Sequence, residues 1–330
     1  MRIVVKYMFC LLLLFAKTVV AQDIHFTQFY AVPMYLNPAF AGMEKCSKLS
    51  FASRNQWSGV NKGYNTYLFS YDDCLPKINS GLGIVAATDV AGTGNLKTNL
   101  VNVNYSYEAL ITRKMSWRFG MQAGYVQKSI NYNNLLFGDQ IARGGNVPSL
   151  DNAVSSRSFL DLSAGSVFYT DMLWVGVSVN HLNKPNEAIS TVYAELPMKT
   201  SVHSGLRIKL NDPPRKAETK YLIPCFNYMH QNKFNQASFG LYYDPGALNF
   251  GLWYRGIPFI NKPKQGYSTN DAVNLLISFS NDKFHFGYSY DITISRLTPL
   301  SGGAHEVVAY YKICRKKKKR NTRLAPCPKF

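Results

Sequence analysis

Residues 283–291 read KFHFGYSYD, and residues 304–313 read AHEVVAYYKI. The first stretch alternates four aromatic residues with polar residues and one glycine. The second alternates less strictly, with Glu306 and Lys312 on its polar side. Successive side chains of a β-strand point to opposite faces, so both stretches predict strands with one apolar and one polar face. In a soluble sandwich the apolar face points inward, whereas in an outer-membrane barrel it points outward to lipid.

The composition favours the membrane barrel. The chain has 330 residues, of which 14% are aromatic and only 17% are charged, with 22 Tyr and 20 Phe. A typical soluble domain has about 25% charged residues. A helical membrane protein needs apolar runs of about 20 residues, and none follows the first twenty positions.

The N-terminus is typical of a signal peptide, predicted here over residues 1–21. A basic start precedes an apolar run at residues 7–16, and Ala21 ends a cleavage motif. The alternative is a membrane anchor, but the run is short and Lys17 interrupts it.

Residues 22–47 form a distinct segment before the first predicted strand. Pro33 and Pro38 exclude a long helix or a central strand, yet the segment is rich in Phe and Tyr. We expect it to pack across the periplasmic mouth of the barrel. The alternative is a simple lead-in to the first strand.

From residue 48 to residue 314 the alternation predicts a single barrel of about fourteen antiparallel strands. The predicted strands are residues 48–56, 64–71, 80–88, 97–109, 115–128, 157–169, 172–181, 199–210, 219–230, 236–243, 248–256, 270–280, 283–291 and 304–314.

Connection length sets the predicted orientation. Connections after even-numbered strands are short and turn-like, whereas most of those after odd-numbered strands are long and rich in Pro, Gly and Asn. Short periplasmic turns and longer extracellular loops are the outer-membrane pattern. Both termini are therefore expected in the periplasm. The long loops are residues 129–156, 182–198, 257–269 and 292–303.

An exported chain can form disulfides. On the predicted topology Cys46 and Cys74 lie at one rim, which suggests one bridge between them. A second is suggested between Cys314 and Cys327, with Cys225 left over.

We find no sequence signal for catalysis, a cofactor or a metal site, because the histidines are scattered and no nucleotide or nucleophile motif is present. Glycines recur in the predicted strands. They fit either barrel geometry, which we favour, or space kept free in the lumen. Arginines of lumen parity, such as Arg54 and Arg118, fit ion pairs, an inner plug or a preference for anions.

The net charge of +18 is concentrated in part at the C-terminus. Residues 315–330 form a basic tail that we expect in the periplasm, either docking on a partner or simply solvated. The signal peptide argues against a nucleic-acid partner. The basic block consists of Arg315, Lys316, Lys317, Lys318, Lys319 and Arg320.

Several spaced motifs resemble the PorP/SprF family of type IX secretion outer-membrane proteins, and the resemblance runs from residue 22 to the C-terminus. It is carried by QFY and LNPAFAG near the start, RNQW at residues 54–57, the closing hairpin and the ending PCPKF. The motif residues are Gln28, Asn37, Pro38, Gly42, Arg54, Trp57, Tyr290, Asp291, His305 and Glu306.

The resemblance implies a non-enzymatic outer-membrane component of type IX secretion, often linked to gliding motility. It implies three partners: outer-membrane lipid, the periplasmic ring lipoproteins of the machine, and large secreted adhesins with a C-terminal sorting domain. The alternative function is a passive, porin-like channel for small solutes, and a barrel enzyme is the least favoured. A lumen filled by residues 129–156 or by the N-terminal segment would favour the partner role, and an open lumen would favour the channel.

Overall fold

The computed structural model describes residues 23–44, 46–60, 62–132, 135, 141, 144, 156–189, 193–211, 219–257, 270–295 and 301–314. The tail that carries the basic block lies outside these residues, as does Cys327.

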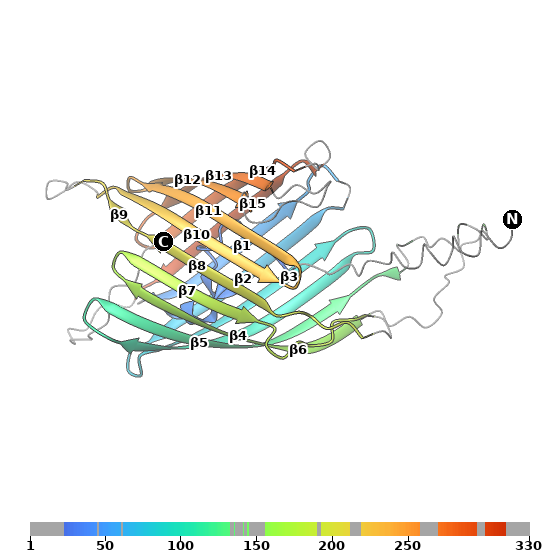
Figure 1. Ribbon diagram of the computed structural model, residues 1–330, viewed down its shortest axis with the longest axis horizontal. Helices are drawn as coiled ribbons and strands as arrows, with labels where there is room; N and C mark the ends of the chain where they lie inside the picture. The colour runs from blue at the N-terminus through green and yellow to red at the C-terminus, as the bar shows by residue number, and fades with distance from the viewer. Residues whose placement is uncertain are drawn as a thin grey trace.

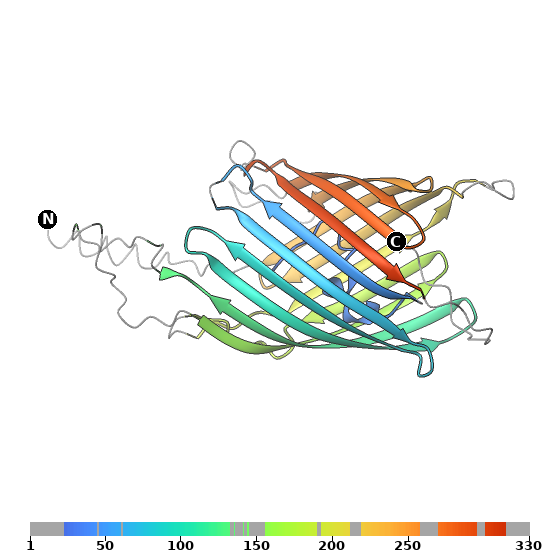
Figure 2. The ribbon, with the colours of Figure 1, turned by 180° about the vertical axis from the view of Figure 1, so that it is seen from behind.

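The described strands form one closed antiparallel barrel (Figures 1 and 2). β1 pairs with β15, and β10 pairs with both β8 and β11, so the ring has no end. Because β9 continues β8 after a break at Arg207, the ring has fourteen strands, and the prediction is confirmed. The strands are β1 (Ser47–Gln56), β2 (Tyr64–Leu75), β3 (Ser80–Ala91), β4 (Leu96–Leu110), β5 (Met115–Ser129), β6 (Ser156–Thr170), β7 (Leu173–Asn180), β8 (Lys199–Leu206), β9 (Ile208–Lys209), β10 (Tyr221–Gln231), β11 (Phe234–Asp244), β12 (Leu248–Gly256), β13 (Asn270–Ser280), β14 (Phe284–Thr293) and β15 (Ala304–Ile313).

The two ends of the barrel differ in their connections. Five short turns lie at the end where β1 begins and β15 ends, which we name the turn rim; they are residues 76–79, 111–114, 171–172, 245–247 and 281–283. The opposite end, the loop rim, carries most of the longer connections. Three connections depart from this rule. Residues 92–95 and 232–233 make short turns at the loop rim, and the connection from residue 210 to residue 220 at the turn rim is long.

The apolar side chains of the barrel face outward. On β14 the outward Phe286 is 45% exposed, whereas the inward Ser289 is fully buried. On β15 the same contrast separates Tyr311, 46% exposed, from the buried Glu306. An apolar exterior around a polar interior is the reverse of a soluble fold and suits a lipid environment.

The N-terminal segment passes through the barrel interior, so the expectation that it packs across the periplasmic mouth is wrong. It includes α2 (Pro33–Leu36) and the short 3-10 helix η1 (Pro38–Phe40). In both views the segment lies inside the ring of strands (Figures 1 and 2). The polar lumen binds the backbone of an irregular segment, which a mouth open to water would leave solvated. No helix among the described residues is long and apolar enough to cross a membrane.

The disulfide differs from the predicted pair. Cys46 bonds to Cys314, with the two Cα atoms 4.4 Å apart, so a Cys46–Cys74 bridge is wrong and Cys314 is not available to Cys327. The registers place Cys46 opposite both Cys74 on β2 and Cys314 beyond β15. A residue is closer to its neighbour in a non-hydrogen-bonded antiparallel pair, at about 4.5 Å between Cα atoms, and this is the distance to Cys314. Cys74 and Cys225 are buried cysteines outside the disulfide.

Candidate functional site

Residues 23–44, which we call the plug, fill the lumen. Two prolines shape the plug, because each supplies a fixed φ at the start of a short helix. Pro33 begins α2 and Pro38 begins η1. Asn37 lies between the two helices, and its side chain accepts a hydrogen bond from the backbone N–H of Ala39 at 2.9 Å. The result is a compact, irregular chain rather than a strand or a long helix.

Arg54 clamps one half of the plug to the seam between β1, β14 and β15. Its guanidinium lies 2.7 Å from Asp291 and 2.9 Å from Glu306, and all three side chains are buried. It also donates to the hydroxyl of Thr27, 2.8 Å away. Glu306 in turn accepts the backbone N–H groups of Thr27 and Gln28 at 2.8 and 2.7 Å. Glu306 therefore pairs with Arg54 and also binds the backbone of the plug, so the plug is part of a buried charge network.

Asn37 anchors the plug to the opposite wall. It is fully buried, and its amide nitrogen lies within 3.2 Å of the carbonyl oxygens of Ser166 and Val177 and of Nε2 of His203. These partners come from β6, β7 and β8. One amide thus ties the plug to three neighbouring strands.

A third anchor binds the end of η1. Arg118 on β5 donates to the carbonyl oxygens of Ala39 and Ala41 at 3.2 and 2.7 Å. The backbone N–H of Gly42 donates to Asp72 on β2 at 3.0 Å. These bonds satisfy backbone groups that the short helix leaves unpaired.

Asp23, the first described residue of the plug, is held near the loop rim by ion pairs. Its carboxylate lies 2.7 Å from Lys199 and 2.8 Å from Nε2 of His181, whose Nδ1 contacts Asp161 at 2.8 Å. Burial by itself raises the pKa of Asp23, but Lys199 and His181 hold it well below the usual range. Burial lowers the pKa of His181, yet Asp23 and Asp161 outweigh this effect and raise it to about 9. Asp23 and His181 are therefore both charged at neutral pH.

Glycines of the barrel wall make room for the plug. A Cβ atom on Gly120 would lie 2.1 Å from the backbone nitrogen of Ala39, and one on Gly165 would lie 2.1 Å from Oδ1 of Asn37. Two interpretations of the strand glycines were open, barrel geometry and space kept in the lumen. At the positions that touch the plug, the glycines keep lumen space that the plug occupies. Others give room to bulky neighbours inside the wall, as Gly205 does for Trp174. The glycines that touch the plug are Gly81, Gly83, Gly120, Gly165 and Gly287.

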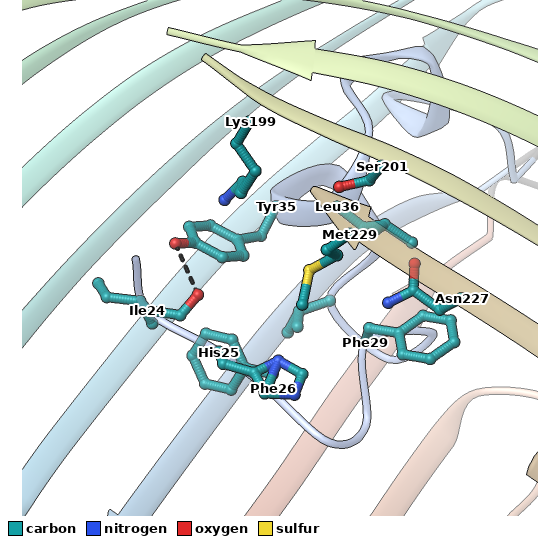
Figure 3. A pocket seen from close by; sticks show the side chains of 11 residues that line it. Ile24, His25, Phe26, Phe29, Tyr35, Leu36, Lys199, Ser201, Asn227 and Met229 are labelled. Carbon is teal, nitrogen blue, oxygen red and sulfur yellow. Dashed lines mark hydrogen bonds between the residues drawn. The ribbon is translucent and has the colours of Figure 1, made fainter. Parts of the chain in front are cut away.

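Aromatic contacts complete the packing. Phe29 meets Trp253 edge-on with 5.1 Å between ring centroids, and Tyr30 meets Tyr242 at 4.9 Å. Small cavities lie between the plug and the wall among the described residues, including two of about 30 and 80 Å³. The smaller one, lined by His25, Tyr35 and other plug and wall residues, is shown in Figure 3. Spaces of this size hold a few water molecules.

Most of the motif residues meet at the plug, although they are far apart in sequence. Six of them contribute contacts described above, and the seventh, Pro38, begins η1 beside Gly120. The six are Gln28, Asn37, Gly42, Arg54, Asp291 and Glu306.

Three motif residues lie elsewhere, near the seam at the loop rim. Trp57 lies in the β1–β2 loop, where its backbone N–H donates to Gly303 at 2.8 Å. Its ring meets that of Tyr64 at 5.0 Å. Tyr290 and the exposed His305 contact each other outside the lumen, with 4.8 Å between ring centroids. The six basic residues of the predicted docking block lie outside the described residues.

Several residues that hold the plug were not predicted from the sequence, among them Thr27, Asp72, His181 and Lys199. Asp72 and Lys199 are polar residues at lumen-facing positions of their strands, and His181 is polar and follows a strand end, whereas Thr27 in the plug carried no such signal. Parity assigns a residue to the lumen, but it does not show which lumen residue meets which part of the plug.

The chemistry of the site is that of holding a segment in place. Among the described residues, no group of three or more His, Cys, Asp or Glu is arranged to hold a metal ion. The charged groups face one another or the backbone of the plug.

Solved structures with a similar shape are outer-membrane proteins. They include the CymD monoaromatic hydrocarbon channel, with 13% sequence identity, coverage of 86% of this chain and 92% of that chain, and a TM-score of 0.49. The Pseudomonas putida toluene transporter TodX has 10% identity, covers 90% and 96%, and has a TM-score of 0.47. BamA from Haemophilus ducreyi lacking POTRA domains 1-3 has 8% identity, covers 82% and 71%, and has a TM-score of 0.41. No curated protein matches the sequence.

The family match is more specific. The model of the type IX secretion system membrane protein PorP/SprF matches residues 18–311, which is most of the chain. The match includes the plug, the seam and every strand that contacts Arg54. The match covers the motifs that suggested the family from sequence, apart from the ending PCPKF, which lies beyond residue 311. The chain belongs to the PorP/SprF family of type IX secretion system membrane proteins.

Proposed function

We propose that this protein is a non-enzymatic outer-membrane component of type IX secretion that assists the export or surface anchoring of large adhesin-type cargo. The cargo carries a C-terminal sorting domain, and the pathway is linked to gliding motility. The turn rim faces the periplasm, where the ring lipoproteins of the machine lie, and the loop rim faces the outside. Outer-membrane lipid surrounds the apolar exterior.

The plugged lumen is the observation that carries this proposal. The plug contacts strands on all sides of the ring, from Arg54 on β1 through Gly165 on β6 to Trp253 on β12. A solute channel needs a continuous aqueous path, whereas a partner needs a rigid body with two distinct rims. A filled lumen therefore supports the partner role over the passive channel.

The first experiment is cross-linking in cells, followed by purification of the full chain and mass spectrometry. We expect a sorting-domain cargo or ring lipoproteins to co-purify, and to be lost from a strain that carries an unrelated tagged barrel. A deletion strain should also retain that cargo in the cell. Normal export without this gene would refute the proposal.

Planar-bilayer recordings test the channel alternative. We expect the purified wild-type barrel to show no steady conductance, because the plug blocks the lumen. A stable open pore in the wild-type protein would make the channel the better assignment.

A periplasmic C-terminal tail is also part of the proposal, whereas Asp23 lies near the loop rim, so the expectation of a periplasmic N-terminus is not kept. Changing Arg315–Arg320 to Gln should weaken co-purification with machine components, and more strongly at low salt than at high salt, because exposed charges are screened by salt. Unchanged recovery at low salt would identify the tail as simply solvated.

A further inference from the structure

β6 extends beyond its neighbour β7 at the loop rim (Figure 1). The β6–β7 ladder runs only from Ala164, opposite Val179, to Tyr169. On its other side β6 stays paired with β5 as far as Ser156, opposite Ser129. Residues 156–162 therefore have one paired edge and one edge that no strand of the described chain covers.

The backbone groups on the open edge belong to alternate residues. Leu162 binds toward the β7 side, with its N–H donating to the side chain of Asn183 at 3.0 Å and its carbonyl accepting from Leu182 at 2.8 Å. The carbonyl of Leu160 accepts from Asn183 at 2.7 Å. By the period of a strand, Ser158 and Ser156 present their N–H and C=O groups to the same side. Within the described chain nothing binds these groups, nor the N–H of Leu160.

This open edge lies beyond the apolar band of the barrel. Tyr125 and Leu160 are opposite each other and exposed, and they form the last apolar pair on the outer face of β5 and β6. The next outward pair is Gln127 with Ser158, which is polar and exposed. The unpaired groups are thus above the lipid, and an unpaired strand edge is a template for another strand.

A cation marks the inner side of the edge. Arg157 is exposed and lies opposite Lys128, a like charge. Lys128 forms an ion pair with Glu187, whereas no carboxylate of the described residues pairs with Arg157. A strand added at this edge would satisfy Arg157 if it carried an acidic side chain at the adjacent inward position.

We propose that residues 156–160 of β6 are a docking edge for an extended, acidic segment of the exported cargo, which adds to the barrel as one more strand. The segment would occupy about 16 Å of edge, at about 3.3 Å per residue. Main-chain hydrogen bonds would supply the affinity, and the pairing of Arg157 with a carboxylate would set the register. This inference rests on the proposed function, because it takes the cargo as the partner.

The test uses the full chain in lipid nanodiscs and the isolated sorting domain of a cargo that fails to be exported in the deletion strain. We expect Ser158→Pro, which removes one edge N–H, to weaken binding at least tenfold, while Ser158→Ala leaves it unchanged. Proline is tolerated on a sheet edge, so the barrel should still fold. Arg157→Glu should weaken binding, and Arg157→Lys should largely preserve it.

Hydrogen exchange of the wild-type complex gives a readout that needs no variant. We expect the amides of Ser156, Ser158 and Leu160 to be unprotected in the free barrel and protected in the complex. Binding without protection there, or equal affinity for Ser158→Pro, would overturn the docking edge and leave the proposed function intact. A deletion strain with normal export would instead refute the function itself.

Discussion

Arg54 is a buried cation that holds two carboxylates and the plug at once. Its contacts with Asp291, Glu306 and Thr27 bring together β1, β14, β15 and the plug. Burying an ion pair costs desolvation, so the net stabilisation by such a network is modest. Removal of one member is far more costly, because the remaining charges stay buried without compensation.

We therefore expect Arg54→Ala to destabilise the protein by about 3–5 kcal/mol, as is typical when one partner of a buried pair is lost. The plug should also become accessible, because Glu306 would repel Asp291 rather than hold Thr27. Urea unfolding in lipid vesicles and protease digestion of the plug measure the two effects. Lys97→Ala, an exposed change on β4, is the control and should do neither. Equal protection of the plug in both variants would contradict the role of Arg54.

The Asp23 cluster gives the plug a defined pH range. The pKa of His181 is raised to about 9, so its stabilising charge is present below its unfolded value near 6.5 and lost as the pH rises through 9. The pKa of Asp23 is lowered, so its contribution is present above its unfolded value of 3.8 and is lost only in strong acid. The plug end should be held most firmly from about pH 4 to pH 6.5, and progressively less firmly from there to pH 9.

The thermal midpoint of the wild-type protein should accordingly fall between about pH 6.5 and pH 9. In the His181→Gln variant this step should be absent, because no proton is lost there. His230→Gln, a change at an exposed histidine, should keep the wild-type profile. Identical profiles for all three proteins would show that His181 does not couple to stability.

At the scale of elements, the plug and the barrel wall are complementary in hydrogen bonding. Short helices expose unpaired backbone groups, and lumen side chains from β2, β4 and β5 bind them. Strand β10 shows a similar accommodation within the wall. Pro224 cannot donate to a ladder, and it lies where β10 passes from pairing with β8 to pairing with β9. Irregular residues are placed where the sheet itself is interrupted.

A side chain at Gly120 should displace the plug. In Gly120→Val the new Cβ atom would lie 2.1 Å from the backbone of Ala39, a clash that costs about 1–3 kcal/mol or more. We expect this variant to conduct ions in planar bilayers, while the barrel itself persists. Ala123→Val, on the outer face of the same strand, is the matched control and should remain closed. A closed Gly120→Val barrel would mean that the plug does not seal the lumen.

At the scale of the whole molecule, the first and last strands close the ring. Their seam is held by the β1–β15 ladder, by the Arg54–Glu306 pair and by the disulfide at the turn rim. The disulfide joins residues separated by 268 positions. A link across so long a loop restricts the unfolded chain strongly.

Cys314→Ser should lower the free energy of unfolding by about 2–5 kcal/mol. Cys46→Ser should have the same effect, and reductant should destabilise the wild-type protein but neither variant. Urea titrations with and without reductant measure this, and peptide mapping without reductant identifies the bonded pair. A linked Cys46–Cys74 peptide would contradict the seam.

Much of the fold could be predicted because alternation is local. A strand that faces lipid on one side and a polar lumen on the other must alternate, so the segments, the antiparallel barrel and its strand number follow from the sequence. Connection lengths likewise separate the two rims. The plug residues Gln28, Asn37 and Gly42 were identified through family motifs, without their partners.

The partners depend on the closed ring. Cys46 has a cysteine opposite it on both sides, and the closed seam places Cys314 with its Cα atom 4.4 Å from that of Cys46, at bonding distance. The plug enters the lumen because glycines and charged groups from distant strands converge there, and parity cannot reveal that convergence. The sequence by itself therefore determined which side of each strand meets lipid, because that depends on the two-residue period of a strand. The tertiary structure alone decided what fills the lumen and what closes the seam, because those contacts join residues far apart in the sequence.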